Sequence, residues 1–280
     1  MNPVPAAPLL SVEGLTVRYS RASRPAADNV SFDLFEGECL GLVGGSGCGK
    51  STVARAIVGL ETPESGRVSL LGRDLAAMGG AERREALRLV QMVFQDSSGA
   101  LDPRMRAGDA VAEALLLHRR AAYPTRRSRA ARVEELFSQV ELDPSLARRW
   151  PHELSGGQRQ RVSIARALAC EPRVLLADEP VSALDVAVQA QLLRTLSELV
   201  SRTGTAMLFV SHDLAVVRCL CSRAVVMENG RVVESGPVDT LFSSPSAPFT
   251  RELLAAVPRL PAGAAAAAAA GLAARRRVLE

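Results

Sequence analysis

Short apolar runs separated by glycine- and proline-containing turns dominate the first third of the chain. Residues 9–19 alternate apolar and polar side chains, whereas residues 39–43 form a continuous apolar run, as in a strand buried on both faces. A helix is expected over about residues 81–88. Further strands are expected over residues 30–35, 66–72 and 89–94. Together these elements predict a mixed α/β core whose early strands are antiparallel.

The pattern changes to helical spacing after residue 95. Apolar side chains recur at this spacing over residues 107–117 and 126–140, and no strand pattern returns before residue 174. We therefore expect a mostly helical insertion over about residues 95–165. Its arginines are interpreted as the solvated face of these helices, with a partner or nucleic-acid surface as the less favoured alternative. They are Arg119, Arg120, Arg126, Arg127, Arg129 and Arg132.

Strand and helix patterns then alternate, which predicts a parallel sheet with helices on both faces. The expected elements are strands over residues 173–177 and 206–210, helices over about 186–201 and 213–220, and a hairpin over 224–233 that turns at Asn229-Gly230. The last segment, residues 261–280, is a low-complexity run of alanine and arginine. We expect it to be disordered, with a frayed helix or a basic tag as alternatives.

The composition is that of a compact globular protein. The chain has 280 residues, 48% of them hydrophobic and 23% charged, which suits one or two domains. A net charge of +4 with only 4% aromatic residues gives no indication of a nucleic-acid stacking surface. None of the five cysteines forms a Cys-x-x-Cys pair, so neither a zinc site nor a disulfide framework is expected. No signal peptide or membrane span is recognised, so another chain would have to hold the protein at a membrane.

Between an expected strand and the helix expected over residues 52–59, the chain matches the phosphate-binding pattern G-x-x-x-x-G-K-[ST]. Glycines let consecutive N–H groups point at an anion, and the helix N-terminus adds partial positive charge. Of 34 basic residues one is lysine, so 34 − 1 = 33 are arginine, and that lysine is Lys50. We expect Lys50 to reach the β- and γ-phosphates and Ser51 to hold Mg²⁺. The predicted nucleotide-binding segment comprises Gly44, Gly45, Ser46, Gly47, Cys48, Gly49, Lys50, Ser51 and Thr52.

Two carboxylates follow the apolar run at residues 174–177, where open α/β sheets bind their ligands. Asp178 is expected to hold Mg²⁺ through its water shell, and Glu179 to polarise the attacking water. A third element, Leu154, Ser155, Gly156, Gly157 and Gln158, precedes a helix expected over residues 159–169. Its serine and glycines at a helix start predict a second anion-facing surface.

These motifs together resemble the ATP-binding subunits of ABC transporters, for which Leu-Ser-Gly-Gly-Gln is the most specific mark. The resemblance covers residues 9–258 and implies a RecA-like P-loop NTPase core with an antiparallel β subdomain and an inserted α-helical subdomain. It implies an ABC-type ATP-binding domain over residues 1–260. In that family two subunits pack head to tail. Two ATP molecules are held between them, each between the phosphate loop of one subunit and the Leu-Ser-Gly-Gly-Gln segment of the other.

Residue roles follow from the same resemblance. Tyr19 matches the aromatic residue that stacks on adenine, and Gln95 matches the glutamine that touches Mg²⁺ and senses the membrane subunit. The metal ligands implied are Ser51, Gln95 and Asp178, and the catalytic residues are Glu179, His212 and Lys50. The loop that crosses the dimer interface is implied at Ser182, Ala183, Leu184 and Asp185.

A finer resemblance is to importers of oligopeptides, dipeptides or nickel. It rests on Phe94-Gln95-Asp96, on residues 101–105 with Arg104, on residues 150–153 and on residues 246–254. Gly45 departs from the acidic residue usual there, and no cysteine follows Cys221, so no iron–sulfur site is expected.

We expect a peripheral ATPase at the cytoplasmic face of the membrane that powers such an importer, with ATP and Mg²⁺ as cofactors. Its expected partners are a second ATP-binding subunit, identical or a sister, two transmembrane permease subunits and, indirectly, a solute-binding protein. No nucleic acid is expected. The alternatives are a soluble ABC-type ATPase of a metabolic complex, such as phosphonate breakdown, and a nucleic-acid-associated ABC ATPase. An ordinary P-loop kinase is disfavoured because it has no use for residues 154–158.

Overall fold

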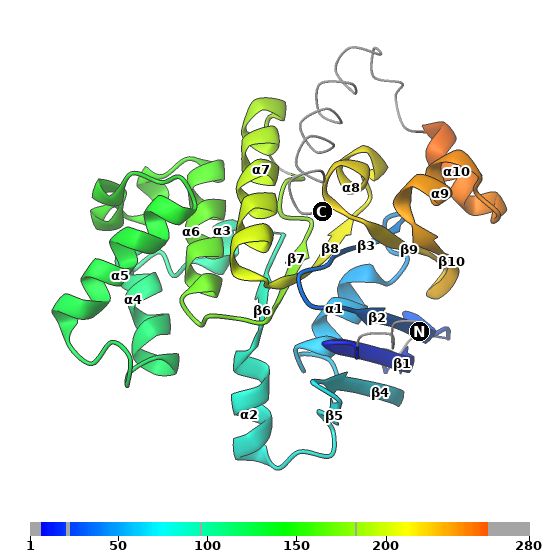
Figure 1. Ribbon diagram of the computed structural model, residues 1–280, viewed down its shortest axis with the longest axis horizontal. Coiled ribbons are helices and arrows are strands. Elements are labelled where there is room, and N and C mark those ends of the chain that lie inside the picture. Colours follow the sequence, from blue (N-terminus) through cyan, green and yellow to red (C-terminus); the bar gives the residue numbers. More distant parts are fainter. Residues whose placement is uncertain (1–6, 21–22, 96, 183, 257–280) are drawn as a thin grey trace, which may run out of the picture.

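The computed structural model describes residues 7–20, 23–95, 97–182 and 184–256. Figure 1 shows a central sheet flanked by helices, a smaller sheet below it, and a helical lobe to one side. The predicted α/β fold, with an antiparallel β part and a helical part beside the core, is confirmed. Within the described ranges, no helix has the length and apolar character needed to cross a bilayer.

The larger sheet has the strand order β10-β9-β3-β8-β7-β6 and is parallel except for the hairpin pair β9–β10. Every residue of β3, β7 and β8 is buried, as expected for parallel strands covered on both faces. The predicted turn at Asn229 and Gly230 is present, with positive φ at both residues. The strands are β3 (Cys39–Gly44), β6 (Val90–Val93), β7 (Val174–Asp178), β8 (Ala206–Ser211), β9 (Arg223–Glu228) and β10 (Arg231–Pro237).

Alternate side chains of the central strands serve two separate cores. Leu40 and Leu42 of β3 face a core shared with helix α1 (Lys50–Ile57) and the smaller sheet. Val43 faces the other core, formed with helices α7 (Val186–Thr203) and α8 (Leu214–Leu220) and with the helical lobe. Because the side-chain period of a strand is two, each strand contributes to both cores.

The smaller sheet is antiparallel, with strand order β2-β1-β4-β5. The alternating pattern of residues 9–19 gives strand β1, whose Leu10, Leu15 and Val17 are almost fully buried against the α1 core. Its strands are β1 (Leu10–Val17), β2 (Ala27–Leu34), β4 (Ser65–Leu70) and β5 (Arg73–Asp74).

The helical lobe occupies the segment with helical spacing, and the described residues from 97 to 168 contain no strand. Its core is formed by fully buried side chains such as Leu115 and Phe137. Helix α6 packs against α4, α5 and strand β6, so it joins the lobe to the large sheet. The helices of the lobe are α3 (Ser97–Ala100), α4 (Ala107–His118), α5 (Arg126–Gln139), the short 3-10 helices Pro144–Arg148 and Pro151–Glu153, and α6 (Gly156–Leu168), whereas α2 (Gly80–Arg88) lies outside the lobe, beside the smaller sheet (Figure 1).

Two helices after the hairpin, α9 (Val238–Ser243) and α10 (Pro248–Ala256), were not predicted. Helix α10 is held by Glu234 of β10, whose carboxylate accepts hydrogen bonds from the Ser246 N–H and hydroxyl, both at 2.8 Å, and from the Ala247 N–H at 3.1 Å. The predicted tail at residues 261–280 lies outside the described residues.

Candidate nucleotide-binding site

The phosphate-binding segment forms a tight loop between β3 and α1, as its sequence predicts. Gly49 precedes α1 with φ 102°, and a Cβ there would lie 2.0 Å from the carbonyl oxygen of Ala26. Gly44 is equally confined, because its Cβ would lie 2.2 Å from the carbonyl oxygen of Met227. Only glycine fits at these two positions, so the backbone itself forms the wall of the loop.

Lys50 is 4% exposed, and its ammonium lies inside this loop. Its Nζ donates to the carbonyl oxygens of Gly44 at 3.0 Å and Gly45 at 2.8 Å. It also lies 3.8 Å from the Sγ of Cys48, a buried thiol whose pKa is raised by burial despite the neighbouring ammonium. The loop therefore presents backbone N–H groups and one point charge, the combination suited to a polyphosphate.

Ser51 and Asp178 meet beside the loop, although 127 positions separate them in the chain. The Ser51 hydroxyl donates to Asp178 Oδ1 at 3.0 Å. Asp178 ends β7 and is 3% exposed, and its burial raises the pKa of the carboxyl while the Ser51 hydrogen bond lowers it. A hydroxyl and a carboxylate are hard oxygen donors, and this donor set fits Mg²⁺.

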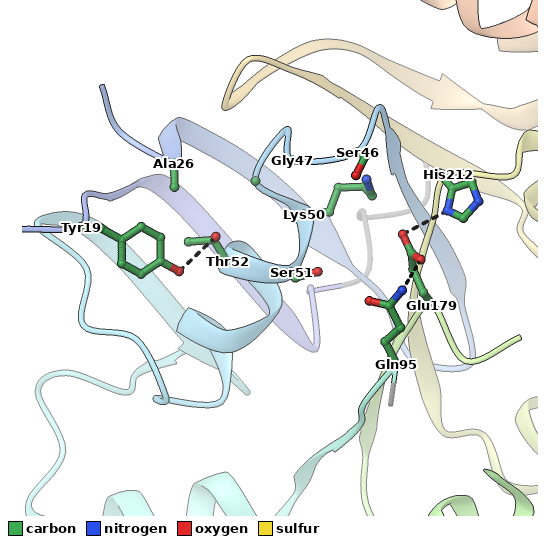
Figure 2. Close-up of a pocket in the computed structure, with 11 residues that line it drawn as sticks. Tyr19, Ala26, Ser46, Gly47, Lys50, Ser51, Thr52, Gln95, Glu179 and His212 are labelled. Atoms are coloured by element: carbon green, nitrogen blue, oxygen red, sulfur yellow. Dashed lines mark hydrogen bonds and ion pairs between the residues drawn. The ribbon is translucent and has the colours of Figure 1, made fainter. Parts of the chain in front are cut away.

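Glu179 follows Asp178 with a positive φ of 46°, which turns its side chain out of the strand direction. Its two carboxylate oxygens have different partners. Gln95 Nε2 donates to Oε2 at 2.9 Å, and His212 Nδ1 lies 3.1 Å from Oε1 (Figure 2). Gln95 comes from the end of β6 and His212 from the end of β8, so three neighbouring strands converge on one carboxylate.

A single open cleft of about 640 Å³ contains most of these groups. Its volume suits a nucleotide-sized ligand. At one end Tyr19, which is 41% exposed, approaches Thr52 Oγ1 at 3.3 Å through its hydroxyl (Figure 2). The sequence did not identify Ala26 as a lining residue, because Ala26 belongs to no recognised motif. The lining residues are Tyr19, Ala26, Ser46, Gly47, Gly49, Lys50, Ser51, Thr52, Gln95, Glu179 and His212.

The serine–glycine element does not line this cleft. Ser155 caps α6: its hydroxyl accepts from the Gln158 N–H at 3.2 Å, while its own N–H donates to Gln158 Oε1 at 2.9 Å. The helix consequently begins at Gly156, three residues before the predicted start at residue 159. The reciprocal serine–glutamine pair is a capping box, a signal that could have located this boundary.

The predicted dimer loop lies beside the cleft and leads into α7. Ser182 donates through its hydroxyl to the Glu179 carbonyl oxygen at 3.1 Å, and Asp185 caps α7 by accepting from the Val188 N–H at 3.0 Å. Leu184 is partly buried in the core that contains α6 and α7. Ala183 and Asp96 lie outside the described residues.

Comparison with known proteins places the chain among nucleotide-dependent transport proteins. A family model described as "ABC transporter" matches residues 27–182. The chain is 45% identical over 253 residues to a putative peptide import ATP-binding protein of Brucella ovis, covering 90% of this chain and 79% of that protein. It is 45% identical over 265 residues to the glutathione import ATP-binding protein of Pectobacterium atrosepticum, covering 91% of this chain and 42% of that protein.

Two solved structures resemble the fold. One is a dimeric ATP-binding cassette in a post-hydrolysis state with ADP and Pi; it has a TM-score of 0.74 and 30% identity and covers 82% of this chain and 98% of that one. The other is CbiO1 from Clostridium perfringens, part of the ABC transporter complex CbiONQ. It has a TM-score of 0.75 and 26% identity and covers 91% of this chain and 97% of that one.

Proposed function

The chain belongs to the ABC transporter family, of which it is an ATP-hydrolysing subunit, and from this premise we propose that it powers an importer for peptides or nickel-type solutes. The names of the peptide and glutathione import relatives support this solute class. We infer a peripheral position at the cytoplasmic face of the membrane, with permease subunits as the anchor.

The observation that carries the proposal is the convergence of Lys50, Ser51 and Glu179 on one cleft. Asp178 does not line the cleft itself but is hydrogen-bonded to Ser51, which does. The loop amides and Lys50 bind and orient the triphosphate, with Tyr19 placed to stack on the base. Glu179 is the general base: its carboxylate, held by Gln95 and His212, accepts a proton from the attacking water. His212, an exposed residue that lines the cleft, is the group we propose to contact the γ-phosphate.

Ser51, Asp178 and Gln95 are the groups we propose to hold Mg²⁺. When bound, the ion would neutralise charge that develops on the phosphate oxygens. The Ser51–Asp178 hydrogen bond at 3.0 Å supports this assignment, because it holds two oxygen atoms that can ligate a metal ion together beside the phosphate-binding loop. Burial of Asp178 gives such a ligand a low-dielectric surrounding, which strengthens its attraction to a cation.

We infer a head-to-tail dimer from the position of the Ser155 tip, by which we mean residues 154–158 at the start of α6. Ser155 is exposed and the tip lies outside the cleft of its own chain, so this helix start is available to a nucleotide on another subunit. ATP would then join two positively polarised surfaces, and hydrolysis would release them. The second subunit is a copy of this chain or a sister chain.

A groove of about 280 Å³ between α1, α2, β6 and α6 is the proposed seat of a permease subunit. Leu60 at its rim is 61% exposed and adds a large apolar side chain to a lining that is mostly apolar. Its wall includes Phe94, the neighbour of Gln95. A permease element bound in the groove would therefore shift Gln95, which donates a hydrogen bond to Glu179. Arg104, on the connection after Gln95, belongs to the same proposed docking surface.

Two measurements test the function. Lys50→Ala removes the only ammonium of the loop. ATP affinity measured by calorimetry should therefore fall by a factor of about 100, as expected when the charge-assisted hydrogen bonds from Lys50 to the phosphates are lost. Normal ATP binding by this variant would refute the site.

Co-expression with the permease genes nearest to its own should yield a membrane complex whose ATPase rate rises with the imported peptide. A chain that copurifies only with soluble proteins would favour the metabolic-complex alternative.

A further inference from the structure

Helices α6 and α7 touch at their N-terminal ends, where each begins next to a proposed interface loop. A Cβ built on Gly157 would lie 2.6 Å from Val188 Cγ1, closer than any relaxed carbon–carbon contact. Val188 is β-branched and sits on a helix, so it has little rotameric freedom to move away. The neighbouring Gly156 is different, because its nearest neighbours would lie 4.0 Å away. Only the second glycine of the tip is therefore required by packing.

A buried polar cluster continues the same contact further along both helices. Arg161 is one turn after Gly157 on α6 and is 4% exposed. Its Nη1 donates to the Val140 carbonyl oxygen at the end of α5 and lies 3.3 Å from Thr195 Oγ1 on α7. It also lies 3.4 Å from Glu141 Oε2, which accepts from Gln191 Nε2 of α7 at 2.7 Å.

The faces used are consistent with helix geometry. Gly157 and Arg161 are spaced i, i+4 on α6, and Val188, Gln191 and Thr195 are spaced i, i+3 and i+7 on α7, so each set forms one stripe. Burying a guanidinium is costly, and Arg161 still leaves Nη2 without a partner among the described residues. Its position therefore depends on the junction of α5, α6 and α7.

We propose that Gly157 and Arg161 are positioning residues that dock α6 onto α7 and thereby fix the Ser155 tip relative to the Asp185 loop. This rests on the proposed function, in which the tip acts on a nucleotide held by another subunit. The tip and the loop then form one rigid unit, so a neighbouring subunit meets both at a set spacing. On this view Gly157 is small because α7 lies against it, independently of any approach to phosphate.

A double-mutant cycle tests the proposal. It is carried out in the full chain with Glu179→Gln, which should accumulate the ATP-bound dimer, and dimerisation is followed by analytical ultracentrifugation. Gly157→Ala should raise the dissociation constant of the ATP-bound dimer by about tenfold or more, because small misplacements are costly at such a site. Adding Val188→Ala removes the clash and should restore most of the affinity, with Val188→Ala alone as the baseline.

Gly156→Ala is the matched control, because a methyl group there meets no close neighbour. Whatever its own effect, Val188→Ala should not reverse it. Nucleotide affinity of the monomer should stay near that of the parent in the Gly157→Ala chain, since its own phosphate loop is untouched. A loss of dimerisation that Val188→Ala fails to rescue would mean that Gly157 acts at the phosphate itself and would overturn the proposal.

Arg161→Met gives an independent readout, because methionine keeps an apolar stem and removes the hydrogen bonds. It should weaken dimerisation while ATP binding by the monomer is retained, and Thr195→Val should give a smaller effect in the same direction. Unchanged dimerisation in a folded Arg161→Met chain would contradict the assignment of Arg161; if that chain does not fold, the Gly157–Val188 cycle decides. Failure of the Glu179→Gln parent to dimerise with ATP would instead refute the proposed function.

Discussion

Gln95 donates a hydrogen bond of 2.9 Å to Glu179, joining the segment after β6 to the segment after β7. Gln95 stands where the sheet leads into the helical lobe, and Phe94 beside it lines the groove proposed for a permease. A displacement in that groove would therefore be transmitted to the proposed general base through a single side-chain amide. This contact gives a physical basis for coupling between transport and hydrolysis.

Replacing the general base should separate hydrolysis from binding. Glu179→Gln keeps the shape of the side chain and one accepting oxygen, but the neutral amide cannot accept the proton, so kcat should fall by a factor of about 10² to 10⁴. ATP affinity should be retained, and the ATP-bound dimer should live longer. Glu36→Gln, an exposed change at the Arg173 ion pair, is the control and should hydrolyse normally. A Glu179→Gln chain with the parental rate would exclude Glu179 from the chemistry.

Tyr19 should contribute by stacking and much less by its hydroxyl. Its ring is 41% exposed at the cleft edge, and its hydroxyl contacts Thr52 and Glu61. Tyr19→Ala should raise KM for ATP by about tenfold, the size expected for one lost base–aromatic contact. Tyr19→Phe retains the ring and should stay within about twofold of the parent. Equal losses in both variants would assign the effect to the hydroxyl instead.

The groove rim should matter for assembly and not for intrinsic catalysis. Leu60→Ser removes an exposed apolar side chain from the groove, so copurification with permease subunits should decrease several-fold, while the ATPase rate of the isolated chain is unchanged. Leu117→Ser is the matched control, because Leu117 is 69% exposed but lies outside the groove. A similar loss in both variants would argue against the groove as the docking site.

Attachment of α10 should depend on pH. Partial burial acts to raise the pKa of Glu234, but hydrogen bonding by Thr250, Ser246 and Ala247 prevails and holds it at about 2, although the Thr250 hydroxyl falls short of a regular hydrogen bond. This pKa lies below the ordinary value of 4.5, so the stabilisation is fully present above about pH 4.5 and is lost as the pH falls towards 2.

Glu234→Gln should therefore lower the protection of α10 amides against hydrogen exchange at pH 7. The difference from the parent should shrink as the pH is lowered below about 4.5. Asp239→Asn, on the neighbouring helix α9, is the control for a lost surface charge. A difference between Glu234→Gln and the parent that stays constant over this pH range would show that the carboxylate charge is not what holds α10.

Most elements were predictable because their periodicity reflects their surroundings. The short apolar run before Asp178 is typical of a strand covered on both faces, and Asn229-Gly230 indicated the hairpin turn. The C-terminal helices were missed because what holds α10 is Glu234, a residue on another element twelve positions before Ser246. A contact between residues on different elements cannot be predicted from the local pattern of apolar and polar residues.

The site was predictable to the extent that it lies in consecutive residues or at strand ends. The sequence motifs identified the loop around Lys50 and the pair Asp178 and Glu179, and the parallel sheet then brings them together. The sequence could not show in the same way why the second glycine of the tip has to be a glycine. Gly157 is small because of Val188, and that neighbour becomes known only when α6 and α7 are placed in space.

The hydrogen bond that caps α6 determines in which direction the Ser155 hydroxyl can donate its hydrogen. Because the Ser155 oxygen already accepts the Gln158 N–H, one of its lone pairs is occupied and its own hydrogen remains to be donated outward. The tip can thus receive an anion without uncapping its helix. Aspartate would cap the helix equally well, yet it would turn the same point from a donor into a repelling charge.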